Sequence, residues 1–251
     1  MTLARQLHSH LPARIRSTPL VEAPARRLRE REAERATREL LERVGPYTMV
    51  SEPALRDLER RVCHVLDAGV PGALVECGTW RGGSSFLMAE VLRRRGEDGR
   101  TVWMFDSFEG LPPPDEIDGP GARTYAEDTE NPLYRDNCRA DLDGVRAAAR
   151  RLDLEGRTEI VPGWFDQTLA AARERIGAIA LLRIDCDWYE PVKLCLETLY
   201  DQVSPGGTLI VDDYYQWDGC TIAVHEFLAR RELPVRIEEA ARIAILEKPH
   251  Q

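Results

Sequence analysis

Residues 73–106, which read ALVECGTWRGGSSFLMAEVLRRRGEDGRTVWMFD, carry the pattern that decides the fold. An apolar run at 73–77 ends in a glycine-rich turn, a helical stretch follows at 83–95, and a second apolar run occupies 101–106. This order of strand, turn, helix and strand predicts a βαβ unit, in which the two strands are parallel.

The same alternation continues to the end of the chain. Further strands are predicted at 158–161, 179–185, 207–213, 234–239 and 241–247, and helices around 52–69, 137–152, 166–175, 190–202 and 219–231. Apolar strands that alternate with helices predict a mainly parallel sheet covered by helices on both faces. The last two strands are joined too tightly for a crossover helix. We therefore expect an α/β fold with a seven-stranded, mainly parallel sheet, an antiparallel last strand and a helical N-terminal extension.

The length of 251 residues fits one α/β domain with a modest extension. Residues 1–45 are predicted to be a helical, partly disordered arm, and residues 46–251 to form the domain. Residues 26–43 alternate charge at the i, i+4 spacing of a helix, which is typical of a solvated helix face; an arm that contacts a partner subunit is the alternative. Residues 107–134 are rich in Pro, Gly and acidic residues, and such a long irregular segment is expected to be a lid or disordered.

The charge of the chain limits the partners it can have. Lys and Arg number 34 and Asp and Glu number 43, and the resulting net charge of −9 argues against binding to a nucleic-acid backbone. Residues 1–43 contain ten Arg and six acidic residues, so this part carries +4 and the rest of the chain −13. No run approaches the roughly 18 apolar residues of a membrane-spanning helix, so we expect no membrane partner.

The N-terminal residues and the cysteines indicate the cytoplasm. Arg5, Arg14 and Arg16 superficially suit a transit peptide, but the first 20 residues lack the continuous apolar core of a secretory signal. The six cysteines form no C-x-x-C pair and no zinc-binding spacing, and most lie in apolar surroundings. We therefore expect a cytoplasmic protein whose thiols are reduced and structural.

The turn after the first strand is a candidate site for a nucleotide-like ligand. Gly78, Gly82 and Gly83 let the backbone approach a ligand, and the helix that follows offers free N–H groups in its first turn. The G-x-x-x-G-G spacing differs from the dinucleotide fingerprint, and Glu76 suits a cationic group better than a pyrophosphate. Asp106, at the end of the next strand, can accept both hydroxyls of a ribose. An ammonium and a ribose together indicate S-adenosylmethionine; the alternative is a packing turn and an ordinary strand-end acid.

Four aspartates end two successive apolar strands, Asp185 and Asp187 on the first and Asp212 and Asp213 on the second. If these strands are neighbours, the four carboxylates meet at the carboxyl edge of the sheet, where open α/β folds bind ligands. Two unit charges about 4 Å apart repel by roughly 4 kcal/mol at an effective dielectric near 20, so a bound cation would relieve the cluster. Oxygen ligands favour Mg²⁺, with Mn²⁺ or Ca²⁺ as alternatives. Helix capping by individual Asp residues is the competing interpretation.

Five segments then point to a known family: YTMVSEPALRDLERRV, PGALVECGTWRGGSS, MFDSFEGLPPP, VPGWFDQTL and LLRIDCDWYEPVKLCLETLYDQVSPGGTLIVDDYY. In this order they resemble the macrocin O-methyltransferase family, over about residues 46–248. The family consists of S-adenosylmethionine- and Mg²⁺-dependent enzymes that methylate sugar hydroxyls of macrolides and related antibiotics. The resemblance implies a Rossmann-like class I methyltransferase fold and a more distant kinship to catechol-type O-methyltransferases.

The resemblance also implies roles for individual residues. The implied metal ligands are Asp185, Asp212 and Asp213. The residues implied to contact the cofactor are Met49, Glu76, Gly78, Gly82, Ser84, Asp106, Ser107, Trp164 and Asp166. For Met49 and Trp164 the alternative is a place in the core, and for Asp166 it is the N-cap of the helix that it opens.

The implied chemistry needs a base. A metal-bound hydroxyl has a lowered pKa, a base removes its proton, and the oxygen attacks the sulfonium methyl group. Asp187, two residues from the metal ligand Asp185, is the candidate base or, alternatively, an orienting residue. His225 is the rival base, with a packed or solvent-facing place as its alternative, and Lys193 either poises a carboxylate or lies on a helix surface.

The expected partner is a small-molecule glycosylated acceptor with two neighbouring hydroxyls, and a homo-oligomer is expected because proteins of the family commonly associate. One alternative is an O-methyltransferase of the same fold that acts on a catechol or another vicinal diol of a polyketide. The DCD sequence at 185–187 also resembles the D-x-D motif of metal-dependent nucleotide-sugar transferases, but that interpretation leaves the glycine turn and Asp106 unexplained. A non-catalytic regulatory protein that binds S-adenosylmethionine predicts a damaged metal site, whereas Asp occupies all three ligand positions.

Overall fold

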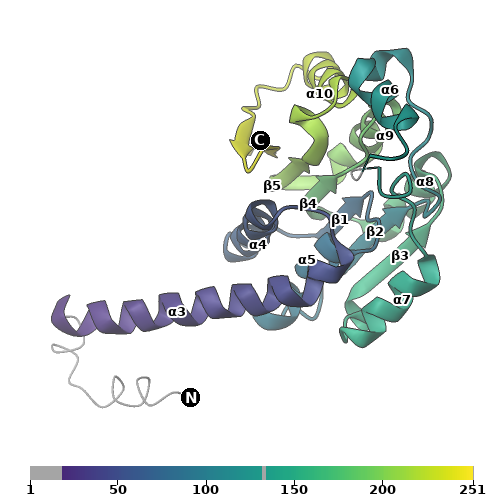
Figure 1. The fold of residues 1–251 in the computed structure, drawn as a ribbon. Helices are drawn as coiled ribbons and strands as arrows, with labels where there is room; N and C mark the ends of the chain where they lie inside the picture. The colour runs from purple at the N-terminus through teal and green to yellow at the C-terminus, as the bar shows by residue number, and fades with distance from the viewer. Residues whose placement is uncertain (1–18, 132–133, 251) are drawn as a thin grey trace. The chain divides into compact units, whose positions relative to one another are not determined.

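The computed structural model describes residues 19–131 and 134–250, and the chain divides into two units, residues 1–43 and residues 44–251. The three N-terminal arginines considered for a transit peptide lie outside the described residues. In the first unit the charged run belongs to one helix, α3 (Pro19–Val44), which carries exposed ion pairs at i, i+4 spacing (Figure 1). The alternating charges therefore lie on the solvated surface of a helix.

The second unit contains a seven-stranded sheet with the strand order β3-β2-β1-β4-β5-β7-β6 (Figure 1). The strands are β1 (Ala73–Cys77), β2 (Val102–Asp106), β3 (Thr158–Pro162), β4 (Ile179–Ile184), β5 (Val203–Val211), β6 (Glu238–Ala240) and β7 (Ile243–Glu247). Neighbours from β3 to β5 are parallel, whereas β7 is antiparallel to both β5 and β6. The predicted seven-stranded, mainly parallel sheet with an antiparallel last strand is confirmed.

Helices cover both faces of the sheet. The α-helices of this unit are α4 (Glu52–Asp67), α5 (Gly83–Arg95), α6 (Gly119–Glu127), α7 (Leu142–Arg151), α8 (Phe165–Ile176), α9 (Tyr189–Leu199) and α10 (Asp218–Arg230). Short 3-10 turns are η1 (Gly45–Tyr47), η2 (Glu116–Asp118), η3 (Glu155–Arg157), η4 (Tyr200–Gln202) and η5 (Asp212–Tyr215). α4 packs against α5 on one face, and α8, α9 and α10 pack in a row on the other.

β1 shows why the strands are almost continuously apolar. All five of its residues are buried, because helices cover both faces of the sheet. Val75 and Cys77 join the core beneath α8, α9 and α10, so the alternate residues Leu74 and Glu76 point to the opposite face. One buried position of this strand is therefore a carboxyl group, which needs a partner inside the protein.

The predicted start of β5 is wrong. The strand begins at Val203, four residues before the expected start at 207. A Pro-Gly-Gly run follows Ser204 and favours a turn, but Val203 pairs with Ile179 and a register shift in the β4–β5 ladder absorbs the extra residues. The tertiary pairing thus overrides the local turn preference.

The segment 107–134, expected to be irregular, contains η2 and α6. Asp115 and Asp118 form a capping box that starts η2. The buried Asp118 also accepts a hydrogen bond of 2.7 Å from the backbone N–H of Tyr189, at the start of α9. This bond anchors the segment to the rest of the unit.

The cysteines lie mostly inside the protein, in keeping with the apolar surroundings seen in the sequence. All six cysteines are free thiols, and four of them are buried. Within residues 19–131 and 134–250, no helix is both long enough and apolar enough to cross a membrane.

The turn after β1 depends on a glycine at its first position. Gly78 has φ +86°, and its N–H donates to the carbonyl of Phe105 at the end of β2. A Cβ at Gly78 would lie 1.7 Å from the carbonyl oxygen of Asp185, just beyond β4. The glycine therefore lets three strand ends converge.

We predict that Gly78→Ala lowers the free energy of unfolding by about 3 kcal/mol or more, because a backbone clash adds to a strained φ. Gly156→Ala is the control, since a Cβ there meets nothing within 4 Å. Urea unfolding of both variants checks the prediction. Equal stability of the two variants would show that the close approach at Gly78 does not matter.

Candidate active site

A cavity of about 520 Å³ opens at the carboxyl ends of β1, β2, β4 and β5, the edge where open α/β sheets bind ligands. Acidic residues from these four strand ends line it: Glu76, Asp106, Asp185 and Asp212. Its walls come from residues outside the sheet, in the segments 47–51, 107–112 and 215–217, together with Tyr125, Trp164 and the β6–β7 turn. The fold thus brings the acidic strand ends into one cavity, as expected from the sequence.

Asp106 organises the glycine turn. Its Oδ2 accepts hydrogen bonds from the backbone N–H groups of Thr79 (2.8 Å) and Trp80 (2.7 Å), and its Oδ1 accepts one from Phe108 (2.7 Å). Burial raises the pKa of Asp106, and these N–H donors act in the opposite direction. Three of the roughly four lone-pair sites of the carboxylate are thus used, and the one left on Oδ1 stays available for a ribose hydroxyl.

Glu76 lies on β1 with 1% of its surface exposed, yet it borders the cavity. Its Oε2 accepts a hydrogen bond from the hydroxyl of Ser85 on α5, and its Oε1 accepts one of 2.6 Å from Nη1 of Arg183 on β4. Burial raises the pKa of Glu76 to about 7, although Arg183 favours the ionised form. Glu76 therefore has a cationic partner within the protein before any ligand binds.

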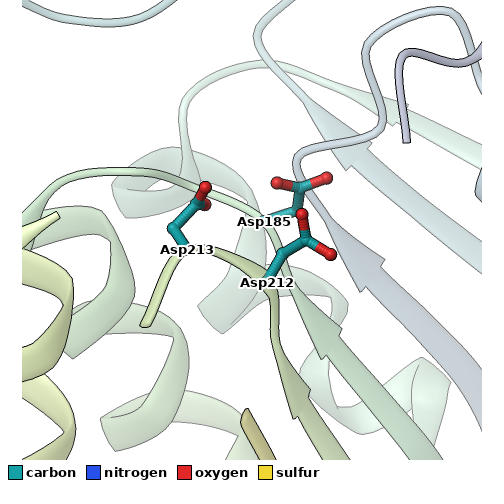
Figure 2. Close-up of side chains that lie close together, drawn as sticks. All are labelled: Asp185, Asp212 and Asp213. Carbon is teal, nitrogen blue, oxygen red and sulfur yellow. The ribbon is translucent and has the colours of Figure 1, made fainter. Parts of the chain in front are cut away.

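Asp185, Asp212 and Asp213 bring their carboxylates together beyond the ends of β4 and β5 (Figure 2). One oxygen atom from each lies within 4.8 Å of the others. Burial raises the pKa of Asp212 to about 6 and that of Asp213 well above its usual value, because an ionised group loses its hydration there. A cation at this position would stabilise the ionised carboxylates.

Each of these three aspartates uses one oxygen for a protein contact. Oδ2 of Asp185 and Oδ1 of Asp212 accept hydrogen bonds of 2.6 and 2.5 Å from the guanidinium of Arg183. Oδ2 of Asp213 accepts one of 3.0 Å from the backbone N–H of Asp187. Three oxygens, one per residue, are thus left for a ligand, and an all-oxygen donor set suits Mg²⁺, Mn²⁺ or Ca²⁺.

Asp187 faces the same cavity from the turn after β4. Its backbone has φ +59°, a conformation that the bond to Asp213 helps to hold. Oδ1 accepts a hydrogen bond of 2.9 Å from the indole N–H of Trp217. Burial raises the pKa of Asp187 to about 7, and the nearby carboxylate of Asp185 acts in the same direction. Such a carboxyl group can take up a proton near neutral pH.

An aromatic cluster stands beside Asp187. The ring of Trp217 contacts those of Trp188 and Tyr125, with centroid distances of 5.1 and 5.8 Å. The indole N–H of Trp188 donates to the carbonyl of Pro112 (2.9 Å), which joins the cluster to the segment 107–134. Since Tyr125 and Trp217 line the cavity, they offer apolar ring surface to a ligand that reaches Asp187.

Most of the residues expected at the cofactor meet at the cavity. Besides the acids, those that line it are Met49, Gly78, Ser84, Ser107 and Trp164. Met49 is 38% exposed, so the alternative of a core position is wrong for this residue.

Three expected residues do not line the cavity. Gly82 has φ +92° and packs against Phe86 and Met104, so its role is in the shape of the turn. Asp166 is an exposed residue in the first turn of α8. The alternative that Asp166 is the N-cap of this helix is wrong as well, because the N-cap is Trp164. His225 is exposed, with its Nε2 2.7 Å from the hydroxyl of Tyr214. The structure therefore leaves Asp187 as the candidate base.

Lys193, considered as a group that poises a carboxylate, lies away from the cavity. Its Nζ is 3.6 Å from Glu190, one turn earlier on α9, and 5.2 Å from the ring centre of Tyr189. The alternative of a helix-surface residue is the one that the structure supports.

Arg183 and Trp217 were not singled out from the sequence. Arg183 is the lone charge in the apolar run IALLRI, and a buried charge requires a partner, so the sequence did contain a signal. Trp217 lies in the loop before α10 and contacts Asp187 from 30 residues away, and nothing in the local pattern predicts that contact.

A family model for the macrocin O-methyltransferases (TylF) matches residues 8–246 of the chain. The match begins well before residue 46, so the expectation that most of the N-terminal arm lies outside the family pattern is wrong. The 8-demethyl-8-(2,3-dimethoxy-alpha-L-rhamnosyl)-tetracenomycin-C 4'-O-methyltransferase of Streptomyces olivaceus is 42% identical over 196 residues, which cover 77% of this chain and 72% of that protein. The demethyldecarbamoylnovobiocin O-methyltransferase of Streptomyces niveus is 40% identical over 190 residues, covering 74% and 70%.

Solved structures show the same likeness. The structure of the O-methyltransferase NovP has a TM-score of 0.73 and 36% identity, and the match covers 81% of this chain and 83% of that one. Methyltransferases from Podospora anserina and Bacillus cereus, both solved with S-adenosylhomocysteine, have TM-scores of 0.55 and 0.51 at 15% and 16% identity. These two matches cover 86% and 84% of this chain and 88% and 90% of those, and they show the fold alone.

We predict that Asp118→Ala loosens the segment 107–134 over the cavity. The backbone N–H groups of Asp115 and Tyr189 would lose their acceptor, which costs about 1 to 3 kcal/mol for a buried donor. Limited proteolysis should cut this segment faster than in the wild type. Glu127→Ala, an exposed change in the same segment, is the control. Equal cutting rates for the two variants would contradict the anchoring role.

Proposed function

Because the chain belongs to the macrocin O-methyltransferase family, we propose that it methylates a sugar hydroxyl of a glycosylated natural product in a Mg²⁺-dependent reaction. Its methyl donor is S-adenosylmethionine, as for the family. The observation that carries the proposal is the single cavity that joins the glycine turn of β1 to the three carboxylates beyond β4 and β5. A donor and an activated hydroxyl could meet there.

The proposed place of the cofactor is the β1–β2 side of this cavity. Gly78 lets the ligand approach the backbone, Ser84 lies in the first turn of α5 at the edge of the cavity, and Asp106 is the proposed acceptor for a ribose hydroxyl. Glu76 is the proposed partner of the ammonium group, and its carboxylate would then bind both this group and Arg183. Trp164 borders the proposed adenine position.

The proposed metal ligands are Asp185, Asp212 and Asp213. Their donor set fits Mg²⁺, since all the donors are oxygens and each residue keeps one oxygen free of protein contacts among the described residues. Held by these three residues, Mg²⁺ would lower the pKa of a hydroxyl bound to it, and the sulfonium of the cofactor would supply a methyl group on a good leaving group.

Asp187 is the proposed general base. Trp217 holds Oδ1, which leaves Oδ2 to face the acceptor. At Oδ2 Asp187 takes the proton that the acceptor hydroxyl loses as its oxygen bonds to the methyl carbon and the carbon–sulfur bond breaks. The products are a methyl ether and S-adenosylhomocysteine. The remaining task of the residues around the cavity is to orient the two reactants, which supplies much of the rate in such a transfer.

The proposed acceptor is a sugar hydroxyl with a second oxygen on the neighbouring carbon. The relative from Streptomyces olivaceus methylates, by its name, the 4'-hydroxyl of a rhamnosyl group that already carries methoxy groups at positions 2 and 3. A neighbouring methoxy oxygen is thus compatible with catalysis in that relative. Tyr125 and Trp217 support a ring-shaped acceptor in this chain, because sugar faces pack well on aromatic rings.

Calorimetric titration tests the proposal. We expect S-adenosylhomocysteine to bind with or without a chelator, and a vicinal-diol glycoside to bind the resulting complex only when Mg²⁺ is present. Acceptor binding and turnover that ignore EDTA would rule out the proposed metal role.

We predict that Asp187→Asn reduces kcat by about 10²- to 10⁴-fold, because the amide keeps the bond from Trp217 but cannot take a proton. Binding of Mg²⁺ and of S-adenosylhomocysteine should not change. Asp153→Asn is a matched control, since Asp153 has φ +60° like Asp187 but is exposed on the surface. A variant that keeps more than about a tenth of the wild-type kcat would exclude Asp187 as the base.

A further inference from the structure

Arg183 is an arginine whose surface is 2% exposed, in the middle of a parallel sheet. It stands directly across from Glu76 in the register of β1 and β4. Its Nη1 lies 2.6 Å from both Glu76 and Asp185, and its Nη2 lies 2.5 Å from Asp212. One guanidinium thus connects acids from three neighbouring strand ends.

The guanidinium of Arg183 is permanently charged. An arginine stays protonated in proteins, and three carboxylates, those of Asp185, Asp212 and Glu76, accept hydrogen bonds from this guanidinium. A permanent cation beside a metal site has two opposite effects on the metal. Its charge repels Mg²⁺, whereas its hydrogen bonds fix the carboxylates that bind Mg²⁺.

The geometry indicates which effect prevails. Asp185 and Asp212 retain 26% and 21% side-chain exposure, so without restraint each carboxylate could rotate toward solvent. The guanidinium holds one oxygen of each and thereby restrains the rotation of both carboxylates, while Asp185, Asp212 and Asp213 keep oxygen atoms within 4.8 Å of one another. A rigid planar fork fixes the directions of two carboxylates at once, whereas the three donors of a lysine ammonium rotate about one nitrogen and fix those directions less strictly.

We infer that Arg183 is a positioning residue, anchored by Glu76, that holds Asp185 and Asp212 in the orientation that binds Mg²⁺. The inference rests on the proposed function, because it assumes that these aspartates bind the metal. It assigns to β4 a residue that shapes the metal site without contacting the metal.

The consequence is a change in metal selectivity. Mg²⁺ demands a nearly ideal octahedral arrangement of oxygens, whereas Ca²⁺ accepts variable geometry and more ligands. Loss of orientation at Asp185 and Asp212 should therefore weaken Mg²⁺ binding more than Ca²⁺ binding. Loss of a merely neutralising charge would instead strengthen the binding of both cations.

The test is calorimetric titration of the metal-free, full-length protein with MgCl₂ and, separately, with CaCl₂. For Arg183→Lys, which keeps the charge, we expect Mg²⁺ affinity to fall about 10- to 100-fold and Ca²⁺ affinity to fall by a smaller factor. Arg175→Lys is the matched control, because Arg175 forms an ion pair with Glu159 on the surface. Urea unfolding and circular dichroism check that each variant is folded.

Arg183→Gln provides a second, independent variant, neutral and planar. We expect it too to lose Mg²⁺ affinity more than Ca²⁺ affinity, and it carries the test if Arg183→Lys does not fold. Unchanged Mg²⁺ binding in Arg183→Lys, tighter Mg²⁺ binding in Arg183→Gln, or equal losses for both cations would each overturn the inference. If the wild type itself does not bind Mg²⁺, the proposed metal role fails as well; if it binds and the variants match it, only the inference about Arg183 fails.

Discussion

The ion pairs of Arg183 are the interaction on which the acidic edge of the sheet depends. β1, β4 and β5 are buried on both faces, so a charge among them has to be neutralised within the protein. Arg183 does this for Glu76, Asp185 and Asp212 from the middle strand of the three. Removing one member of such a buried group costs about 3 to 5 kcal/mol, because the partners are left uncompensated. The residues proposed for the cofactor and for the metal can stand side by side because a permanent cation lies between them.

The architecture was predictable wherever short-range patterns determine it. The runs predicted at 73–77 and 101–106 form β1 and, from Val102, β2, and the acids at the ends of parallel strands meet because such strands end at the same edge. Sequence patterns failed where a distant partner decides the outcome. Val203 extends β5 because Ile179 pairs with it, and Asp118 helps to order a segment that looked irregular because Tyr189 binds it. Neither partner is visible from within the segment concerned.

The residues of the candidate site were easier to predict than their partners. Glu76 and Asp106 border the cavity as expected, but Glu76 already binds Arg183 and Asp106 already holds the glycine turn. Arg183 and Glu76 are single charges in two otherwise apolar strands. Pairing them requires the knowledge that β1 and β4 are neighbours, which follows from the strand order of the whole sheet and from no local motif.

The walls of the cavity have a different origin from its acidic edge. They come from the segments 107–112 and 215–217, from Tyr125 and from the β6–β7 turn, all outside the strands that end in the acids. Trp217 belongs to both parts, because it faces the cavity and also holds Asp187. Elsewhere in the walls, substitutions can accumulate without disturbing the ion pairs at the strand ends. Evolution or protein engineering can therefore change the loops to fit a new acceptor, while the acidic residues at the strand ends and their ion pairs are retained.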